Sequence, residues 1–143
     1  MGWASEFAKI LFLQSNSKNG FIGLSLYPYH LKNHGNCKLE DFCEMINQLV
    51  NMIGEDNVGI GSDLCMNWPD SVVMWMRNGK WTKKIDYGES KDKNASWPEP
   101  VSWYSKPEDI SDFLSGMILN GVHEKTAHKI VGSNWLNFMK NHF

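Results

Sequence analysis

The chain has 143 residues, which is the length of one ordinary domain. Its 42% hydrophobic and 21% charged residues are typical of a globular protein and argue against disorder. A formal net charge of -2 gives no general electrostatic attraction to nucleic acid or to anionic membranes. We therefore expect neither of them as a partner.

Membrane insertion and export leave no mark in the sequence. The longest apolar stretches, such as Phe21 to Tyr29, are far shorter than the roughly 20 residues that cross a bilayer. No export signal is visible at the N-terminus, although a truncated chain would not show one. The three cysteines, Cys37, Cys43 and Cys65, are an odd number and include no Cys-x-x-Cys pair. These features leave the compartment open, and free thiols fit a cytoplasmic location best.

The first part of the chain, residues 1–63, predicts a βαβ unit. Phe21 to Tyr27 (FIGLSLY) is a short apolar run typical of a strand buried on both faces. Apolar residues then recur at helical spacing from Leu39 to Ile53, and Gly54 follows as a C-cap. Asn57 to Asp63 (NVGIGSD) predicts a second strand. A crossover helix implies two parallel strands of one sheet, which need not be neighbours, and hence an α/β fold.

The second part, residues 64–106, has no clear periodicity and is rich in tryptophan. A short helix around Ser71 to Arg77 is compatible with the pattern, and the aromatic content argues against disorder. Long irregular stretches of this kind are usually functional lids. The third part, residues 107–143, begins with a helix that Pro107 opens and Asn120-Gly121 ends. Two shorter helical pieces follow, at about His123 to Val131 and Ser133 to Lys140.

The candidate site residues follow the two predicted strands. Asp63 comes directly after the second strand, where α/β proteins place their functional groups. The alternative for Asp63 is a helix cap or a loop hydrogen bond. Tyr27, at the end of the first strand, offers a hydroxyl to a substrate, or is a half-buried packing residue. Tyr29 and His30 lie just beyond it and would line the same opening.

Other polar residues give weaker indications. Arg77 is the only arginine in the chain, and it offers a bidentate partner for a substrate carboxylate or is a plain surface residue. His30 and His34 have the spacing of a metal-binding pair on a helix, but Pro28 and Gly35 favour a loop there. We therefore predict no metal ligand within this chain.

Several segments together resemble the membrane dipeptidases, also called renal dipeptidases, a family of zinc metallopeptidases. They are FIGLSLYPYHLK, LEDFCEMINQLV, and NVGIGSDLC followed by PDSVVMWMRNGKWTK. The terminal GSNWLNFM resembles the Gly-x-Asn-(Trp)-Leu helix start that closes these proteins. The resemblance implies the C-terminal portion of a (β/α)8 TIM barrel. Phe21 to Tyr27 would be its seventh strand and Val58 to Ser62 its eighth, with an aromatic-rich lid loop and closing helices after them.

The resemblance also implies a reaction, the hydrolysis of dipeptides by water activated between two zinc ions. Asp63 would shuttle the proton, and Tyr27 would contact the substrate. The family's zinc ligands lie upstream of where this chain begins, and the chain contains no His-x-Asp pair of the kind that binds zinc there. Asp63-Leu64-Cys65-Met66 stands where many members have Asp-Phe-Asp-Gly, which suits a bacterial subgroup with an aromatic lid.

A complete barrel takes about 250 residues and eight strands, whereas two strands are predicted here. We therefore expect a fragment that is inactive alone and that is poorly soluble, forms a homodimer or larger oligomer, or pairs with the missing N-terminal barrel section. One alternative is a non-catalytic module whose Trp-rich loop stacks on sugars or docks peptides. Another is a decayed dipeptidase that survives only as an interaction piece.

Overall fold

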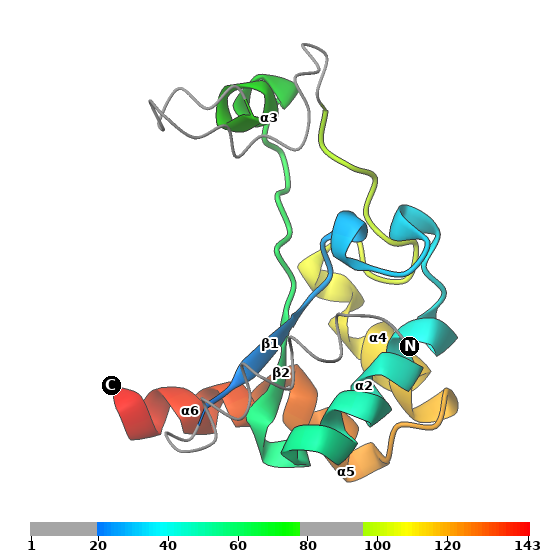
Figure 1. The fold of residues 1–143 in the computed structure, drawn as a ribbon, viewed down its shortest axis with the longest axis vertical. Helices are drawn as coiled ribbons and strands as arrows, with labels where there is room; N and C mark the ends of the chain where they lie inside the picture. The colour runs from blue at the N-terminus through cyan, green and yellow to red at the C-terminus, as the bar shows by residue number, and fades with distance from the viewer. Residues whose placement is uncertain (1–19, 78–95) are drawn as a thin grey trace.

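A computed structural model describes residues 20–77 and 96–143. In it, β1 (Ile22–Ser25) and β2 (Val58–Gly61) form a two-stranded parallel sheet, with Ile22 opposite Val58. The crossover between them contains α2 (Leu39–Ile53), which lies beside the sheet in Figure 1. The predicted α/β organisation is therefore present, and the two strands are direct neighbours.

Helix α2 has the bounds that the apolar spacing predicts. Glu40 and Asp41 lie in its first turn, where negative side chains complement the positive end of the helix dipole. Gly54 ends it at a φ of 85°, a conformation that costs glycine no steric penalty. Its buried face consists of Phe42, Cys43, Ile46, Leu49 and Ile53.

The remaining elements follow the two strand ends and the C-terminal third of the chain. Short 3₁₀ turns are η1 (Pro28–His30), η2 (His34–Asn36), η3 (Glu55–Asn57) and η4 (Pro107–Asp109). The helices are α3 (Asp70–Arg77), α4 (Ile110–Leu119), α5 (Glu124–His128) and α6 (Asn134–His142), with the π-helical turn η5 (Lys129–Ser133) between the last two. No helix in residues 20–77 or 96–143 combines the length and apolar character that crossing a bilayer requires.

One hydrophobic core joins the sheet to the helices. The apolar face of the sheet, which carries Leu24 and Val58, packs with the buried face of α2 and with α4. Trp103 belongs to this core, because its ring stacks on Phe113 with centroids 5.4 Å apart and its Nε1 donates to the Cys37 carbonyl at 2.8 Å. This tryptophan therefore packs between α2 and α4, away from α3.

The opposite face of the sheet carries small residues, since Gly23 pairs with Gly59 and Ser25 with Gly61. Trp135 of α6 lies across both Gly23 and Gly59, and Phe21 also packs on Gly59. Gly23 itself is exposed. The first strand was expected to be buried on both faces, and it is covered on this face only in part because a glycine face offers little surface to bury.

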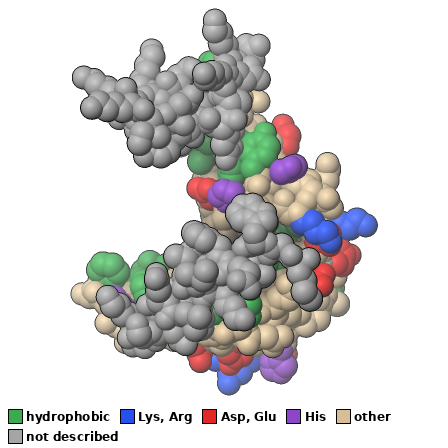
Figure 2. All heavy atoms as spheres, viewed as in Figure 1, with side chains coloured by type: hydrophobic (Ala, Val, Ile, Leu, Met, Phe, Trp, Pro, Cys, Tyr) green, Lys and Arg blue, Asp and Glu red, His purple; other side chains and the backbone are tan. Residues whose placement is uncertain are grey.

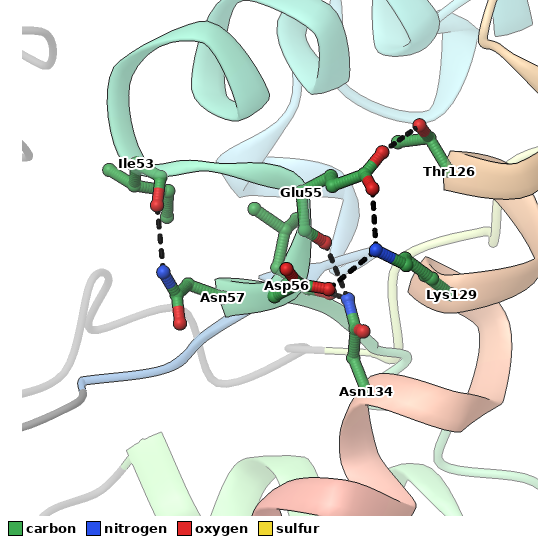
Figure 3. A network of polar contacts seen from close by, with 8 residues as sticks. Ile53, Glu55, Asp56, Asn57, Thr126, Lys129 and Asn134 are labelled. Carbon is green, nitrogen blue, oxygen red and sulfur yellow. Dashed lines mark hydrogen bonds and ion pairs between the residues drawn. The ribbon is translucent and has the colours of Figure 1, made fainter.

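The C-terminal helices bind the start of β2 through a polar network (Figure 3). Lys129 forms ion pairs with Glu55 at 2.5 Å and Asp56 at 2.6 Å, and the Thr126 hydroxyl donates to Glu55 at 2.6 Å. Asn134, which is 3% exposed, donates its side-chain N–H groups to the carbonyls of Glu55 at 2.7 Å and Val58 at 2.8 Å.

The π turn η5 explains how both Lys129 and Asn134 reach the same segment. A π turn relates residue i to residue i+5, so two side chains five positions apart come to one side of the helix. The sequence predicted two separate helical pieces here. The structure instead has one continuous helical stretch, because Ser133 keeps a helical φ of -64° and ψ of -31°.

Two side chains also close the free edge of β2. Leu26 N–H donates to the Gly61 carbonyl at 3.4 Å, so that carbonyl faces β1. Carbonyls alternate along a strand, and those of Val58 and Ile60 therefore face away from β1. They accept hydrogen bonds from Asn134 and from the Trp135 indole N–H at 2.8 Å. The Asn-Trp pair of the closing motif thus binds the outward carbonyls of β2 at these two positions.

The glycine face predicts a contrast between two substitutions in β2. A Cβ at Gly59 would lie 2.5 Å from Phe21 Cζ and 2.6 Å from Trp135 Nε1, whereas a Cβ at Gly61 would meet its nearest atoms at 3.7 Å. We expect Gly59→Ala to lower the free energy of unfolding by about 1–3 kcal/mol through overpacking. Gly61→Ala should leave it within about 0.5 kcal/mol of the original chain. Urea unfolding followed by tryptophan fluorescence measures both, and equal losses would contradict the packing described.

The polar network predicts a pH dependence of stability. Hydrogen bonds from Lys129 and Thr126 lower the pKa of Glu55 from 4.5 to about 2. A carboxylate whose pKa is lower in the folded chain stabilises it above the unfolded pKa, so this contribution is lost as the pH falls from about 4.5 to about 2. We expect Glu55→Gln to lower the Tm at pH 7 and to flatten its decline over that range.

Thermal unfolding by circular dichroism at a series of pH values tests this expectation. Glu108→Gln, which changes an exposed glutamate in η4, is the matched control and should keep the original pH profile. A Glu55→Gln chain whose Tm falls as steeply as that of the original would show that Glu55 is not the group responsible.

Candidate functional site

The carboxyl ends of β1 and β2 open into a pocket of about 400 Å³. Parallel strands place these ends at one edge of the sheet, which is where α/β folds hold ligands. The chain after β1 contributes Leu26, Tyr27, Pro28 and His30, and the chain after β2 contributes Ser62, Asp63, Leu64, Cys65 and Met66. Val73 of α3, Trp97, Pro98, Glu99, Pro100 and Ser105 complete the lining. Figure 2 shows acidic and histidine side chains beside apolar ones at this neck between α3 and the sheet.

Asp63 lines the pocket in an unusual backbone conformation. Its φ is 54°, in the left-handed region that residues other than glycine seldom adopt and that aspartate and asparagine tolerate best. It does not cap a helix, because the next helix begins at Asp70. The side chain is exposed at the mouth of the pocket. Such strained residues concentrate at functional sites.

Tyr27, Tyr29 and His30 form an aromatic cluster on the β1 side of the pocket. The Tyr27 ring lies edge-on to the rings of Tyr29 and His30, with centroids 5.6 Å and 5.1 Å apart. Tyr27 and His30 line the pocket, whereas Tyr29 is exposed behind them and contacts His34 at 5.4 Å. The structure therefore brings Tyr27, His30 and Asp63 together around one cavity and places Tyr29 next to it.

Ser25 holds this cluster and was not among the residues that the sequence singled out. Its Oγ accepts the Tyr27 backbone N–H at 3.1 Å and lies 3.1 Å from His30 Nδ1. The sequence signal that could have identified Ser25 is a small polar residue at the last position of a strand, five positions before a histidine.

Residues 96–100 form the far wall of the pocket, which Figure 1 shows as the segment that returns from α3. Trp97 is held by its backbone N–H, which donates to Asp70 at 3.2 Å, and by its indole N–H, which donates to the Pro69 carbonyl at 3.4 Å. Further along, the backbone at Glu99 packs closely on Gly35, where a Cβ would lie 3.0 Å from the Glu99 carbonyl oxygen.

The other predicted residues are less informative. Arg77 is the last residue of α3, and its side chain lies outside the described part of the structure. Trp81 falls within residues 78–95, which are also outside it. Trp68 and Trp75 are 62% and 55% exposed on the segment that carries α3.

Metal-binding groups do not gather in the described residues. His30 and His34 belong to separate 3₁₀ turns, as the loop interpretation predicted. In residues 20–77 and 96–143, no three histidine, cysteine, aspartate or glutamate side chains come together in a way that would hold a metal ion.

Two of the three cysteines are buried thiols, Cys37 and Cys43. Burial raises the pKa of the Cys43 thiol to about 11 and also raises that of Cys37, which keeps both protonated at neutral pH. Cys65 is an exposed residue of the pocket lining, and its Sγ lies 3.7 Å from the Asp63 carbonyl oxygen.

Comparison with known proteins places the fold. No protein-family model matches the chain, and no curated protein matches it. Among solved structures, an amidohydrolase from Pseudomonas aeruginosa matches 94% of this chain with a TM-score of 0.71 and 20% sequence identity. The match covers 38% of that protein, so this chain spans well under half of its length. At this identity the likeness is one of fold alone: the chain folds like part of that structure.

Proposed function

We propose that this chain is the C-terminal section of a metal-dependent amidohydrolase of the membrane dipeptidase type. The observation that carries the proposal is the convergence of Tyr27, His30 and Asp63, from two adjacent strand ends, on one pocket. The likeness of fold to an amidohydrolase supports it. The proposed reaction is hydrolysis of the amide bond of a dipeptide.

Asp63 is the proposed acid–base group. An exposed carboxylate at the mouth of a largely apolar pocket can take a proton from attacking water and return it to the leaving amine. Tyr27 and His30 on the facing wall offer groups that hold the substrate. The apolar lining, with Leu26, Leu64 and others, suits the side chain of a dipeptide.

The proposed zinc ions would be bound by an upstream section of the full protein, which makes that section the proposed partner. The resemblance assigns the ligands to residues that precede this chain, and the described residues offer no cluster that would replace them. Bound zinc would activate water and polarise the scissile carbonyl in the complete protein. A homodimer of the complete protein is part of the same proposal.

Reconstitution tests the proposed function. The purified chain is mixed with the upstream barrel section of a related dipeptidase, and hydrolysis of dipeptides and zinc content are measured for the mixture and for each part alone. We expect activity and bound zinc only in the mixture. Loss of a general acid–base group should lower kcat about 10²–10⁴-fold in Asp63→Asn.

Asparagine tolerates the left-handed backbone of Asp63, so the variant should fold normally. Asp112→Asn changes an exposed aspartate of α4 and should leave kcat unchanged. A mixture that forms a stable, zinc-loaded complex but hydrolyses no dipeptide would contradict the proposal.

A non-catalytic binding module is the second candidate, favoured by the exposure of Trp68 and Trp75. Exposed indole faces stack on sugars and on aliphatic side chains. Titration of the chain with oligosaccharides and short peptides, read by tryptophan fluorescence, tests it. Saturable binding by this chain alone that is lost in Trp68→Ala, together with inactive mixtures, would favour the module over the enzyme.

A further inference from the structure

Ser25 is the last residue of β1, and its hydroxyl organises the turn that starts the pocket wall. One Oγ atom meets two groups, the Tyr27 backbone N–H and His30 Nδ1, each at 3.1 Å. Because a strand end is held by the sheet ladder, both contacts fix the turn to a rigid element. The hydroxyl therefore links the sheet directly to two of the residues at the pocket.

The contact with Ser25 restrains an imidazole that would otherwise rotate. His30 is exposed in the three-residue turn η1, where little packing holds it. Ser25 engages Nδ1, and the Tyr27 ring lies edge-on to the imidazole at 5.1 Å. With Nδ1 engaged, Nε2 is the ring nitrogen that remains for a ligand in the pocket.

The direction of these hydrogen bonds selects a tautomer. A backbone N–H can only donate, so Ser25 Oγ accepts the bond from Tyr27. The single hydrogen of the hydroxyl is then directed at Nδ1, which accepts it, and the ring proton of the neutral imidazole stays on Nε2. In the opposite tautomer Nδ1 carries the proton and would donate it to Ser25 Oγ. That oxygen would then accept two hydrogen bonds, and its own hydrogen would need a different acceptor.

The charges around the pocket indicate which ligand atom this donor would meet. Asp63 and Glu99 are the carboxylates in the lining, and no lysine or arginine of the described chain contributes to it. A ligand carboxylate would be repelled by these two groups. A neutral carbonyl oxygen accepts the same hydrogen bond without that repulsion.

We propose that Ser25 is a positioning residue that holds neutral His30 as its Nε2–H tautomer, which donates a hydrogen bond to a carbonyl oxygen of the substrate. The tautomer follows from the geometry of this chain, whereas the carbonyl acceptor rests on the proposed function. The two parts therefore have separate readouts.

The tautomer is measured by long-range ¹H–¹⁵N correlation on chain labelled with ¹⁵N-histidine, in complex with unlabelled upstream section, at pH 8. The His30 signals are identified by their loss in His30→Gln. We expect an unprotonated Nδ1 and a protonated Nε2 in the original chain and in Ser25→Thr, which keeps the hydroxyl. Ser25→Ala should show shifts averaged between the two tautomers. Ser62→Ala, which removes a hydroxyl at the end of the other strand, should leave His30 unchanged.

Kinetics of the reconstituted enzyme test the acceptor. Loss of a hydrogen bond worth roughly 0.5–1.5 kcal/mol corresponds to about a twofold to tenfold fall in kcat/KM. We expect a fall of this size for Ser25→Ala. Ser25→Thr, which keeps the hydroxyl, should have the kcat/KM of the original chain. A thioamide sulfur accepts hydrogen bonds less well than an amide oxygen. With a dipeptide that has a thioamide in place of the amide, the difference in kcat/KM between the original chain and Ser25→Ala should therefore be smaller.

The outcomes are distinct. A His30 ring protonated on Nδ1 in the original chain, or one whose tautomer Ser25→Ala does not alter, would overturn the positioning role. An unchanged kcat/KM in Ser25→Ala would overturn the carbonyl acceptor. Mixtures that hydrolyse no dipeptide would reject the proposed function. If the Nε2–H tautomer is nevertheless lost in Ser25→Ala and kept in the other chains, the positioning role of Ser25 is supported.

Discussion

The hydrogen bonds from Asn134 and Trp135 to the carbonyls of Val58 and Ile60 are the contacts on which the rest of the structure depends. A sheet of two short strands is only marginally stable by itself. These bonds attach the C-terminal helices to its edge, and the ion pairs of Lys129 attach the same helices to the turn before β2. The position of β2, and with it the position of Asp63 at the other end of the strand, follows from this attachment.

Local signals predicted the elements whose formation depends on local spacing. The apolar period from Leu39 to Ile53 and Gly54 after it predict α2 because a buried stripe and a glycine C-cap of positive φ are both local properties. The spacing alone left open whether β1 and β2 are neighbours, since neighbourhood in a sheet depends on contacts far apart in sequence, whereas the resemblance made them consecutive strands of a barrel, which are neighbours. The π turn was missed for a related reason: it places Lys129 and Asn134 against a turn more than 70 residues away.

The site shows the same division. Asp63 and Tyr27 were predicted from their positions after strands, and the structure places both at one pocket. Ser25 was overlooked because a serine inside an apolar run has no visible partner until the chain turns back at Pro28. Trp97 and Glu99 reach the pocket because Asp70 and Pro69 hold the returning segment, which is a contact between residues about 28 positions apart.

The closed edge of β2 also bears on how copies of this chain would associate. A sheet with two open edges can add strands in both directions and grow into a fibre. Here the outward carbonyls of β2 at Val58 and Ile60 are already bound, while β1 has β2 as its sheet partner within the described residues. Among the described residues, strand addition between copies would therefore favour the edge of β1 over that of β2. Two such edges meeting about a twofold axis satisfy each other, so this mode of association ends at a pair.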